Sequence, residues 1–432
     1  TVMRDHPAGV RSVILDSTYP IAADIMSESP ANLNRALGTL FSACANDQAC
    51  RTTYPDLEAR LFRLIDQLDA DPVGFTARDF LSGEQYDVLL DGTGLLGTVF
   101  QGLYSEDVFP QLPQLIEDLE VGDTVIASLL TSNDIVNAQF FSFGMHLSVQ
   151  CREEVPFTSA AAIDAGLEPY PRLTDLFDES INLSTPVFEV CDLWQSGTAD
   201  PLENAPVESD IPTLVMAGSF DPITPPDWGL QVATSLDNSA FVEFPTLGHG
   251  TSVAGECPVE IALEFVNDPG AEPATGCIRS MDPVPFVIAP FDVSAIRLEA
   301  FREDVFGTML SGVVPEGWES IGDGAWTRGE TALDQTSIVQ QPLPPGLDEG
   351  FVLGLYEDQL GVIDSLAFQG EVASPSFTWR LFSGDIDGFV VDVALANRSD
   401  VTGLILMVSE PEERDDLFGA VFQPALDAFE TT

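Results

Sequence analysis

The stretch 211–252 (IPTLVMAGSFDPITPPDWGLQVATSLDNSAFVEFPTLGHGTS) constrains the fold more than any other part of the chain. It contains two short apolar runs, 213–217 and 240–244, each typical of a buried strand in a parallel sheet. Pro226 stands near the expected start of a helix between them. This order of strand, helix and strand predicts an α/β fold.

Each predicted strand is followed by a segment rich in glycine and proline that carries one titratable residue. Asp221 stands in GSFDP after the first strand, and His249 stands in GHG after the second. In an open α/β sheet, functional groups gather at the carboxyl ends of the strands. We therefore expect Asp221 and His249 to lie on neighbouring strand ends.

An aspartate and then a histidine, both after a nucleophile, is the chain order of α/β-hydrolases. GSFDPITPP, followed by GHGT, resembles the end of the tripeptidyl aminopeptidase and proline iminopeptidase group. This resemblance implies that Asp221 orients the imidazole and that His249 is the general base. A turn aspartate beside an unrelated histidine is the alternative, and spacing, context and order all argue against it.

The serine of such a triad is expected in a G-x-S-x-G motif, which the sequence does not contain. The nearest match, at 250–254, follows His249 and lacks a preceding strand. The segment 10–17 (VRSVILDS) is expected to be a strand, and it resembles the segment that follows the nucleophile elbow in this group. We therefore expect the chain to be truncated, so that it starts after the catalytic serine.

Charge and hydropathy exclude two classes of partner. The chain has 70 acidic and 16 basic residues, giving a net charge of −54, and it contains no lysine. Such a charge repels phosphate backbones, so no nucleic-acid partner is expected. No apolar run approaches the roughly 20 residues that a membrane-spanning helix needs.

Six cysteines indicate disulfide bonds: Cys44, Cys50, Cys151, Cys191, Cys257 and Cys277. Their number is even and they form no C-x-x-C motif, which favours a secreted or cell-envelope protein. The sequence does not fix the pairing, although the three local pairs 44–50, 151–191 and 257–277 are the simplest choice. Six buried free thiols are the alternative.

The region 29–206 separates the first predicted strand from the others and is expected to be mostly helical. Apolar residues at i, i+3 and i+4 predict helices at 31–45, 56–68, 92–104, 113–119 and 135–149. An insertion of this size between two sheet strands is typical of a helical cap over an α/β-hydrolase site. We expect the hydrolase core at 1–28 and 207–280.

Glu153 and Glu154 are the candidate substrate-binding residues of the cap. In the tripeptidyl aminopeptidase group, acidic residues at a similar place hold the free N-terminal amine of the substrate. The resemblance implies that this pair binds an ammonium group, since a carboxylate near a pocket pairs strongly with a cation. Two solvated surface acids are the alternative in a chain with so many carboxylates.

Three further polar residues are considered as candidates for the functional site. Asp16 ends the first predicted strand, where some α/β-hydrolases carry their triad acid, but Asp221 has the stronger context. His6 and His146 show no metal-ligand spacing, so neither a metal site nor a cofactor is expected.

A linker at 281–290 is expected to lead into a second domain, 291–432. Before the linker, a helix at 258–266 is expected to close the hydrolase sheet. After it, alternating apolar residues predict antiparallel strands at 295–301, 336–340, 377–382, 388–396 and 402–408. Helices at 350–360 and 412–429 are expected to cover one face of that antiparallel sheet. The turn at 314–318 and the last helix resemble PsbP-like α+β domains. The region has no histidine and no cysteine, which favours an accessory binding or stabilising module.

The sequence thus predicts a partial α/β-hydrolase sheet with a large helical cap, followed by a smaller α+β domain. By the resemblance, the activity is that of a serine exopeptidase that releases short peptides from free N-termini. Its partner would be a peptide substrate. An esterase or lipase with the same triad, and a non-catalytic binding protein, are the alternatives.

Overall fold

The computed structural model describes residues 2–79, 81–179, 186–288, 296–329, 334–359, 366–386, 389–411 and 413–431. The chain divides into two compact units, Thr1–Val287 and Ile288–Thr432, which we call unit 1 and unit 2. In the described part of the chain, no helix is both long and apolar enough to cross a membrane.

Unit 1 contains a three-stranded parallel sheet in the order β1 (Val13–Asp16), β4 (Thr213–Gly218), β5 (Ser239–Phe244). Every residue of β4 is buried, as its unbroken apolar run requires of a central parallel strand. The strands expected in the stretch 211–252 are therefore present, and the strand expected at 10–17 is shorter than predicted.

Helices cover both faces of this small sheet. Leu214 and Met216 of β4 pack with Phe265 of α13 (Glu256–Asn267) in one apolar cluster. On the other face lies α12 (Pro226–Thr234), where Gly229 comes so close that a Cβ atom would stand 3.4 Å from a methyl of Val215. The alternation along β4 thus assigns successive side chains to two helices, as in an α/β layer structure.

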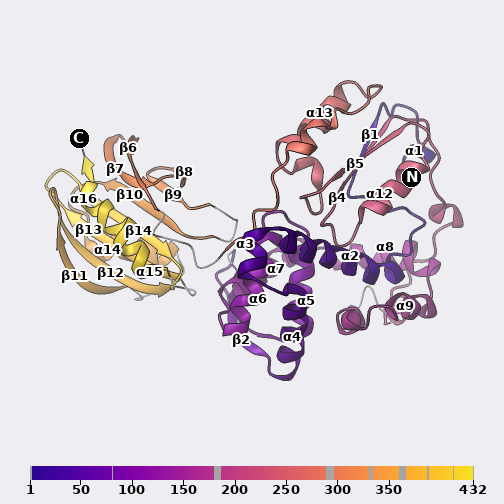
Figure 1. Ribbon diagram of the computed structural model, residues 1–432, viewed down its shortest axis with the longest axis horizontal. Coiled ribbons are helices and arrows are strands. Elements are labelled where there is room, and N and C mark those ends of the chain that lie inside the picture. The colour runs from indigo at the N-terminus through magenta and orange to yellow at the C-terminus, as the bar shows by residue number, and fades with distance from the viewer. Residues whose placement is uncertain are drawn as a thin grey trace. The chain divides into compact units, whose positions relative to one another are not determined.

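The long insertion between β1 and β4 is mainly helical, and Figure 1 shows its labelled helices below the parallel sheet in this view, with α2 next to β4. Its helices are α2 (Ile25–Asn46), α3 (Gln48–Thr53), α4 (Leu57–Ala70), α5 (Gly92–Gly102), α6 (Leu112–Val121), α7 (Val125–Phe140), α8 (Phe143–Val149), α9 (Ala160–Leu167), α10 (Thr174–Glu179) and α11 (Val187–Trp194). A short helix, α1 (Val2–Asp5), precedes β1.

Three details of the insertion correct the sequence prediction. The helix expected at 135–149 is divided between two helices. The first, α7, ends at Phe140, and Ser142 caps α8 by accepting a hydrogen bond from the Met145 N–H at 3.4 Å. The helix expected from Ala31 begins six residues earlier, where Asp24 caps α2. An antiparallel hairpin of β2 (Val73–Arg78) and β3 (Gln85–Leu90) was not expected.

All six cysteines pair in unit 1. The bonds join Cys44 to Cys50, Cys151 to Cys191 and Cys257 to Cys277. The local pairing favoured by the sequence is therefore confirmed in the structure. The second bond fixes α11 to the turn that carries Glu153 and Glu154.

Unit 2 is built on a seven-stranded antiparallel sheet in the order β11-β12-β13-β14-β10-β9-β8. Its strands are β8 (Glu319–Gly322), β9 (Ala325–Thr327), β10 (Ser337–Leu343), β11 (Ala367–Ala373), β12 (Thr378–Ile386), β13 (Phe389–Asn397) and β14 (Thr402–Ser409). A second sheet contains β6 (Leu298–Val305), β7 (Thr308–Pro315) and β15 (Glu430–Thr431). The antiparallel domain expected from the alternating pattern is present, with more strands than predicted.

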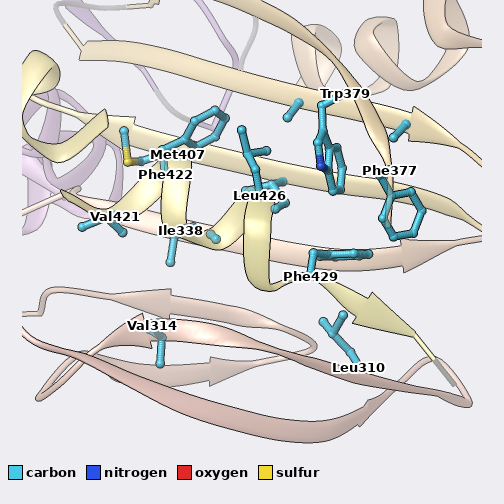
Figure 2. Packing of buried hydrophobic residues seen from close by; sticks show 14 of the residues in the cluster. Leu310, Val314, Ile338, Phe377, Trp379, Met407, Val421, Phe422, Leu426 and Phe429 are labelled. Atoms are coloured by element: carbon cyan, nitrogen blue, oxygen red, sulfur yellow. The ribbon is translucent and has the colours of Figure 1, made fainter. Parts of the chain in front are cut away.

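Each face of the large sheet has its own apolar core. On one face, Trp379 and Met407 pack with Phe422 and Phe429 from the C-terminal helical region, and Leu310 of β7 closes the cluster (Figure 2). That region comprises α15 (Arg414–Leu417), η9 (Phe418–Phe422) and α16 (Gln423–Ala428). On the other face, α14 (Glu349–Gln359) contributes Val352 to a second cluster.

Candidate active site

The carboxyl ends of β4 and β5 are joined by main-chain hydrogen bonds and by close glycine contacts. The N–H of Ser219 donates to Phe244 O, and that of Phe220 donates to Leu247 O, both at 2.9 Å. A Cβ atom at Gly218 would stand 2.0 Å from Gly248 O. Only glycine permits this approach, which brings the two strand-end loops together.

Asp221 and His249 meet at this junction. Oδ2 of Asp221 lies 2.9 Å from Nδ1 of His249. The aspartate is fully buried, whereas 36% of the histidine side chain is exposed. Because a carboxylate only accepts hydrogen bonds, Nδ1 carries the proton and Nε2 is left as a proton acceptor.

The carboxylate of Asp221 is held by three further donors from its own turn. Oδ1 accepts from the N–H groups of Ile223 at 3.0 Å and Thr224 at 2.8 Å. Oδ2 accepts from the Thr224 hydroxyl at 2.6 Å. A buried carboxylate with this many donors stays in place and is satisfied without solvent.

The pKa of His249 is raised above its ordinary value. Burial by itself lowers the pKa, but the hydrogen bond and the charge of Asp221, together with the charge of Asp16, outweigh it. The imidazole is therefore a stronger base than an isolated histidine, which suits a group that must take up a proton.

Asp16 contacts the main chain after His249, not the imidazole. Its carboxylate accepts from the N–H groups of Thr251 at 2.9 Å and Ser252 at 2.7 Å. Ser17, whose φ is +49°, accepts from the Gly250 N–H at 2.7 Å. Three successive N–H groups are thus bound to the end of β1, which fixes the loop that carries His249.

One face of α2 holds the loop that carries Asp221. The guanidinium of Arg35 donates to Ser219 O at 2.6 Å and also to Asp221 O. The amide of Asn32 donates to Ile223 O at 3.2 Å. Sequence reasoning missed both residues. Asn32 and Arg35 are three positions apart and therefore share one face of α2, which could have indicated a polar contact on that face.

Tyr104, which follows α5, is a third residue that the sequence did not indicate. Its carbonyl oxygen accepts from the His249 N–H at 2.8 Å. Its ring lies 5.1 Å from the imidazole, centre to centre. A Cβ atom at Gly248 would stand 2.3 Å from the same carbonyl, so the glycine of GHG is needed for this contact.

The two candidate acids of the cap have different environments. Glu153 is exposed, whereas Glu154 is half-buried and accepts from the Tyr19 hydroxyl at 2.8 Å. Burial raises the pKa of Glu154, helped by the charge of Glu153 and opposed by the Tyr19 hydrogen bond. Tyr19 in turn lies beside Trp228, with ring centres 6.0 Å apart.

Trp228 connects this acid to the start of α2. Its Nε1 donates to a carboxylate oxygen of Glu28 at 2.9 Å. Trp228 stands in α12, directly after the loop that carries Asp221. Glu28, Trp228, Tyr19 and Glu154 therefore form a chain of contacts that begins beside the Asp221 loop.

Metal ligation has no support within the described ranges, where no group of three or more His, Cys, Asp and Glu residues is placed to hold an ion. His146 lies in α8, beside the ring of Phe141 with ring centres 5.2 Å apart. His6 follows α1 and is exposed.

Comparison with known proteins agrees with this geometry. No curated protein matches the chain. Residues 182–277 match a family model described as TAP-like protein. The matched segment contains β4, α12 and β5, and with them both Asp221 and His249. The match supports an α/β-hydrolase of the TAP-like group.

Proposed function

We propose that the chain is part of a serine exopeptidase that releases short peptides from free N-termini. The observation that carries the proposal is the contact of 2.9 Å between the buried Asp221 and the solvent-accessible His249, within the segment similar to TAP-like proteins. In this reaction, Nε2 of His249 accepts the proton of a serine hydroxyl while the serine oxygen attacks the scissile carbonyl. The same nitrogen later donates the proton to the leaving amine.

Asp221 would have two roles in that cycle. Its hydrogen bond keeps the proton on Nδ1, so that Nε2 is free to act as base. Its charge stabilises the imidazolium that forms when the serine proton is taken up. Both roles require an ionised carboxylate, and the three local donors favour that form.

The nucleophile is a serine that these 432 residues do not supply in a G-x-S-x-G motif. We test this with a fluorophosphonate probe on two proteins: the chain of 432 residues, and the product of the complete coding sequence that contains it. The proposal expects labelling of the second and not of the first. Stoichiometric labelling of the 432-residue chain would contradict it and would make Ser252 the first residue to map.

Glu154 is the residue that we propose to bind the ammonium group of the substrate, with Glu153 at the solvent edge. The half-buried carboxylate of Glu154 is stabilised in its charged form when a cation approaches, because its burial is otherwise unfavourable. Glu154→Gln should raise KM about tenfold or more for peptides with a free amine. N-acylated peptides are the matched control and should show no change.

Substrate panels separate the peptidase from an esterase on the same triad. Tripeptidyl nitroanilides should be turned over faster than short-chain esters. Faster hydrolysis of the esters, with no effect of Glu154→Gln, would favour the esterase.

We also propose that the protein is exported. Three disulfide bonds in unit 1 support this, because such bonds persist in oxidising compartments. Fractionation of the source cells, followed by alkylation of free thiols, tests it. Recovery in the cytosol with reduced cysteines would contradict the proposal.

A further inference from the structure

Arg35 lies at the middle of α2, a helix of the insertion, and its guanidinium reaches the loop after β4. One terminal nitrogen donates to Ser219 O at 2.6 Å and the other donates to Asp221 O. These two carbonyls flank Phe220, so the planar guanidinium spans the residue before the proposed acid. Both acceptors are main-chain atoms.

The same loop is also bound by the end of β5 and by the loop that follows it. The N–H groups of Ser219 and Phe220 donate to Phe244 O and Leu247 O. The main chain at 219–221 is therefore held through two of its N–H groups and through two of its carbonyl groups. Arg35 supplies the side-chain donors to the two carbonyls that flank Phe220.

The partial burial of the Arg35 guanidinium is energetically unfavourable by itself. Burial lowers its pKa, while the charges of Asp221, Glu243 and Asp227 act in the opposite direction. A guanidinium placed against neutral carbonyls loses hydration that the hydrogen bonds only partly replace. An apolar residue of similar size would fill the same space on α2 without that cost.

We propose that Arg35 is a positioning residue for the triad. By fixing the carbonyls of Ser219 and Asp221, it holds the Asp221 carboxylate at Nδ1 of His249. The catalytic value of this arrangement rests on the proposed function, whereas the positioning of the pair does not. The insertion would then position the pair of Asp221 and His249 through Arg35, in addition to binding the substrate through Glu154.

The first test is an NMR titration of the 432-residue chain with labelled histidine. The chain has three histidines, and loss of one signal in His249→Gln assigns the residue of interest. The carboxylates that act on the imidazole are Asp221, which bonds to it, and Asp16, which acts through its charge, and the ring of Tyr104 lies beside it. In Arg35→Ala, the pKa of His249 should fall by roughly half a unit or more toward its ordinary value of about 6.5, because the Asp221 contact is populated less.

Arg35→Lys separates the geometry from the charge. Lysine keeps the positive charge but cannot span two carbonyls, so the pKa of His249 should fall in this variant as well. Arg60→Ala is the matched control, because Arg60 is a buried arginine of the insertion that pairs with Glu117 and Glu120. It should leave the His249 titration unchanged.

Activity provides the second test, in the protein that carries the nucleophile. Arg35→Lys should lower kcat by about tenfold to a hundredfold with KM unchanged, because a displaced acid affects the chemical step and not substrate binding. If the titration of His249 in folded Arg35→Lys equals that of the wild type, the inference is overturned. If the titration shifts but neither protein hydrolyses peptides, the positioning stands and the proposed function fails.

Discussion

Two buried aspartates, one in each unit, show how the partner of a carboxylate decides its use. Asp221 in unit 1 is fully buried and bonds to His249. Asp392 in unit 2 is 2% exposed and bonds to Arg414 through both oxygens, at 3.0 and 2.8 Å. Histidine gains and loses a proton near neutral pH, whereas arginine stays charged. The pair of Asp221 and His249 can therefore take part in proton transfer, whereas the pair of Asp392 and Arg414 can only stabilise the fold.

The surroundings of the two pairs also differ, because the first is open to solvent and the second lies on the region that closes an apolar core. The loop of Asp221 is held by main-chain contacts to Arg35 and to the His249 loop, and one edge of the imidazole is open to solvent. Arg414 lies over the ring of Phe418, 4.5 Å from its centre, on the helical region that closes the apolar core. Unit 2 contains neither histidine nor cysteine. We therefore propose a stabilising or binding role for it.

The largest expected effect separates the two aspartates by activity. Asp221→Asn should lower kcat by about 10⁴ with little change in stability, because the asparagine amide favours the wrong tautomer of His249. Asp392→Asn should leave kcat unchanged, and so should cost only stability. Peptide nitroanilide kinetics and chemical denaturation of both variants measure this.

Asp16→Asn is a further control for the acid. Its carboxylate binds the N–H groups of Thr251 and Ser252 and not the imidazole, so kcat should fall far less than in Asp221→Asn. A larger loss in Asp16→Asn than in Asp221→Asn would move the triad acid to the end of β1.

The next effect concerns a buried ion pair that is purely structural. Arg328 bonds to Asp334 at 2.5 Å and to Glu413 at 2.7 Å, and all three side chains are less than a tenth exposed. Arg328→Ala leaves two buried carboxylates without this cation, which should lower the unfolding free energy of unit 2 by about 3–5 kcal/mol. Denaturation followed by tryptophan fluorescence measures it.

Arg398→Ala is the surface counterpart in the same unit. Arg398 pairs with Asp400, whose side chain is 62% exposed, so its removal should change stability by less than about 1 kcal/mol. Equal effects of the two arginine variants would show that burial does not set the strength of these pairs.

Sequence reasoning succeeded where a local pattern determines the outcome. The fully buried strand β4 follows from its apolar run. The meeting of the Asp221 and His249 loops follows from the glycines beside them, which allow the two backbones to approach closely. The contacts of α2 could not be predicted in this way. Arg35 meets Asp221 across 186 residues of chain, and no periodicity records which loop a helix face will meet.

The start of α2 illustrates the same limit. The helix was expected to begin after Pro30, but it continues through this proline from Ile25. The additional turns carry Glu28, which binds Trp228. Asp24 caps the helix and also accepts from the Thr158 hydroxyl, at 2.6 Å, so a distant segment favours the earlier start.

A third prediction tests the difference in covalent bonding between the units. All six cysteines lie in unit 1, and the bond between Cys151 and Cys191 closes a separation of 40 residues. Replacing both by serine should lower the stability of unit 1 by roughly 3–4 kcal/mol, since the unfolded chain is no longer constrained. Unit 2 should unfold as before, which calorimetry of the double variant checks. A shift of both transitions would show that the units unfold together.

The smallest expected effect is a pH dependence that only the first aspartate pair can produce. The folded-state pKa of His249 is raised, so the protonated imidazole is stabilised by folding. Its contribution to stability is fully present below the unfolded pKa of about 6.5 and is lost as pH rises through the folded value. Catalysis has the opposite sign, because the general base must be neutral, and kcat/KM should fall as pH drops through the pKa of His249 in the free enzyme.

His249→Gln isolates this contribution. Asp134, whose pKa burial raises to about 6, changes charge at slightly lower pH and is common to both proteins. Above about 6.5, wild-type unit 1 should therefore lose more stability per pH unit than the variant, measured by urea denaturation at a series of pH values. The stability of unit 2 should be the same in both proteins, because Arg414 stays charged and its pKa is raised further by Asp392. Equal slopes for unit 1 in the two proteins would mean that the pair of Asp221 and His249 does not form in solution, and the distinction between the two buried aspartates would be lost.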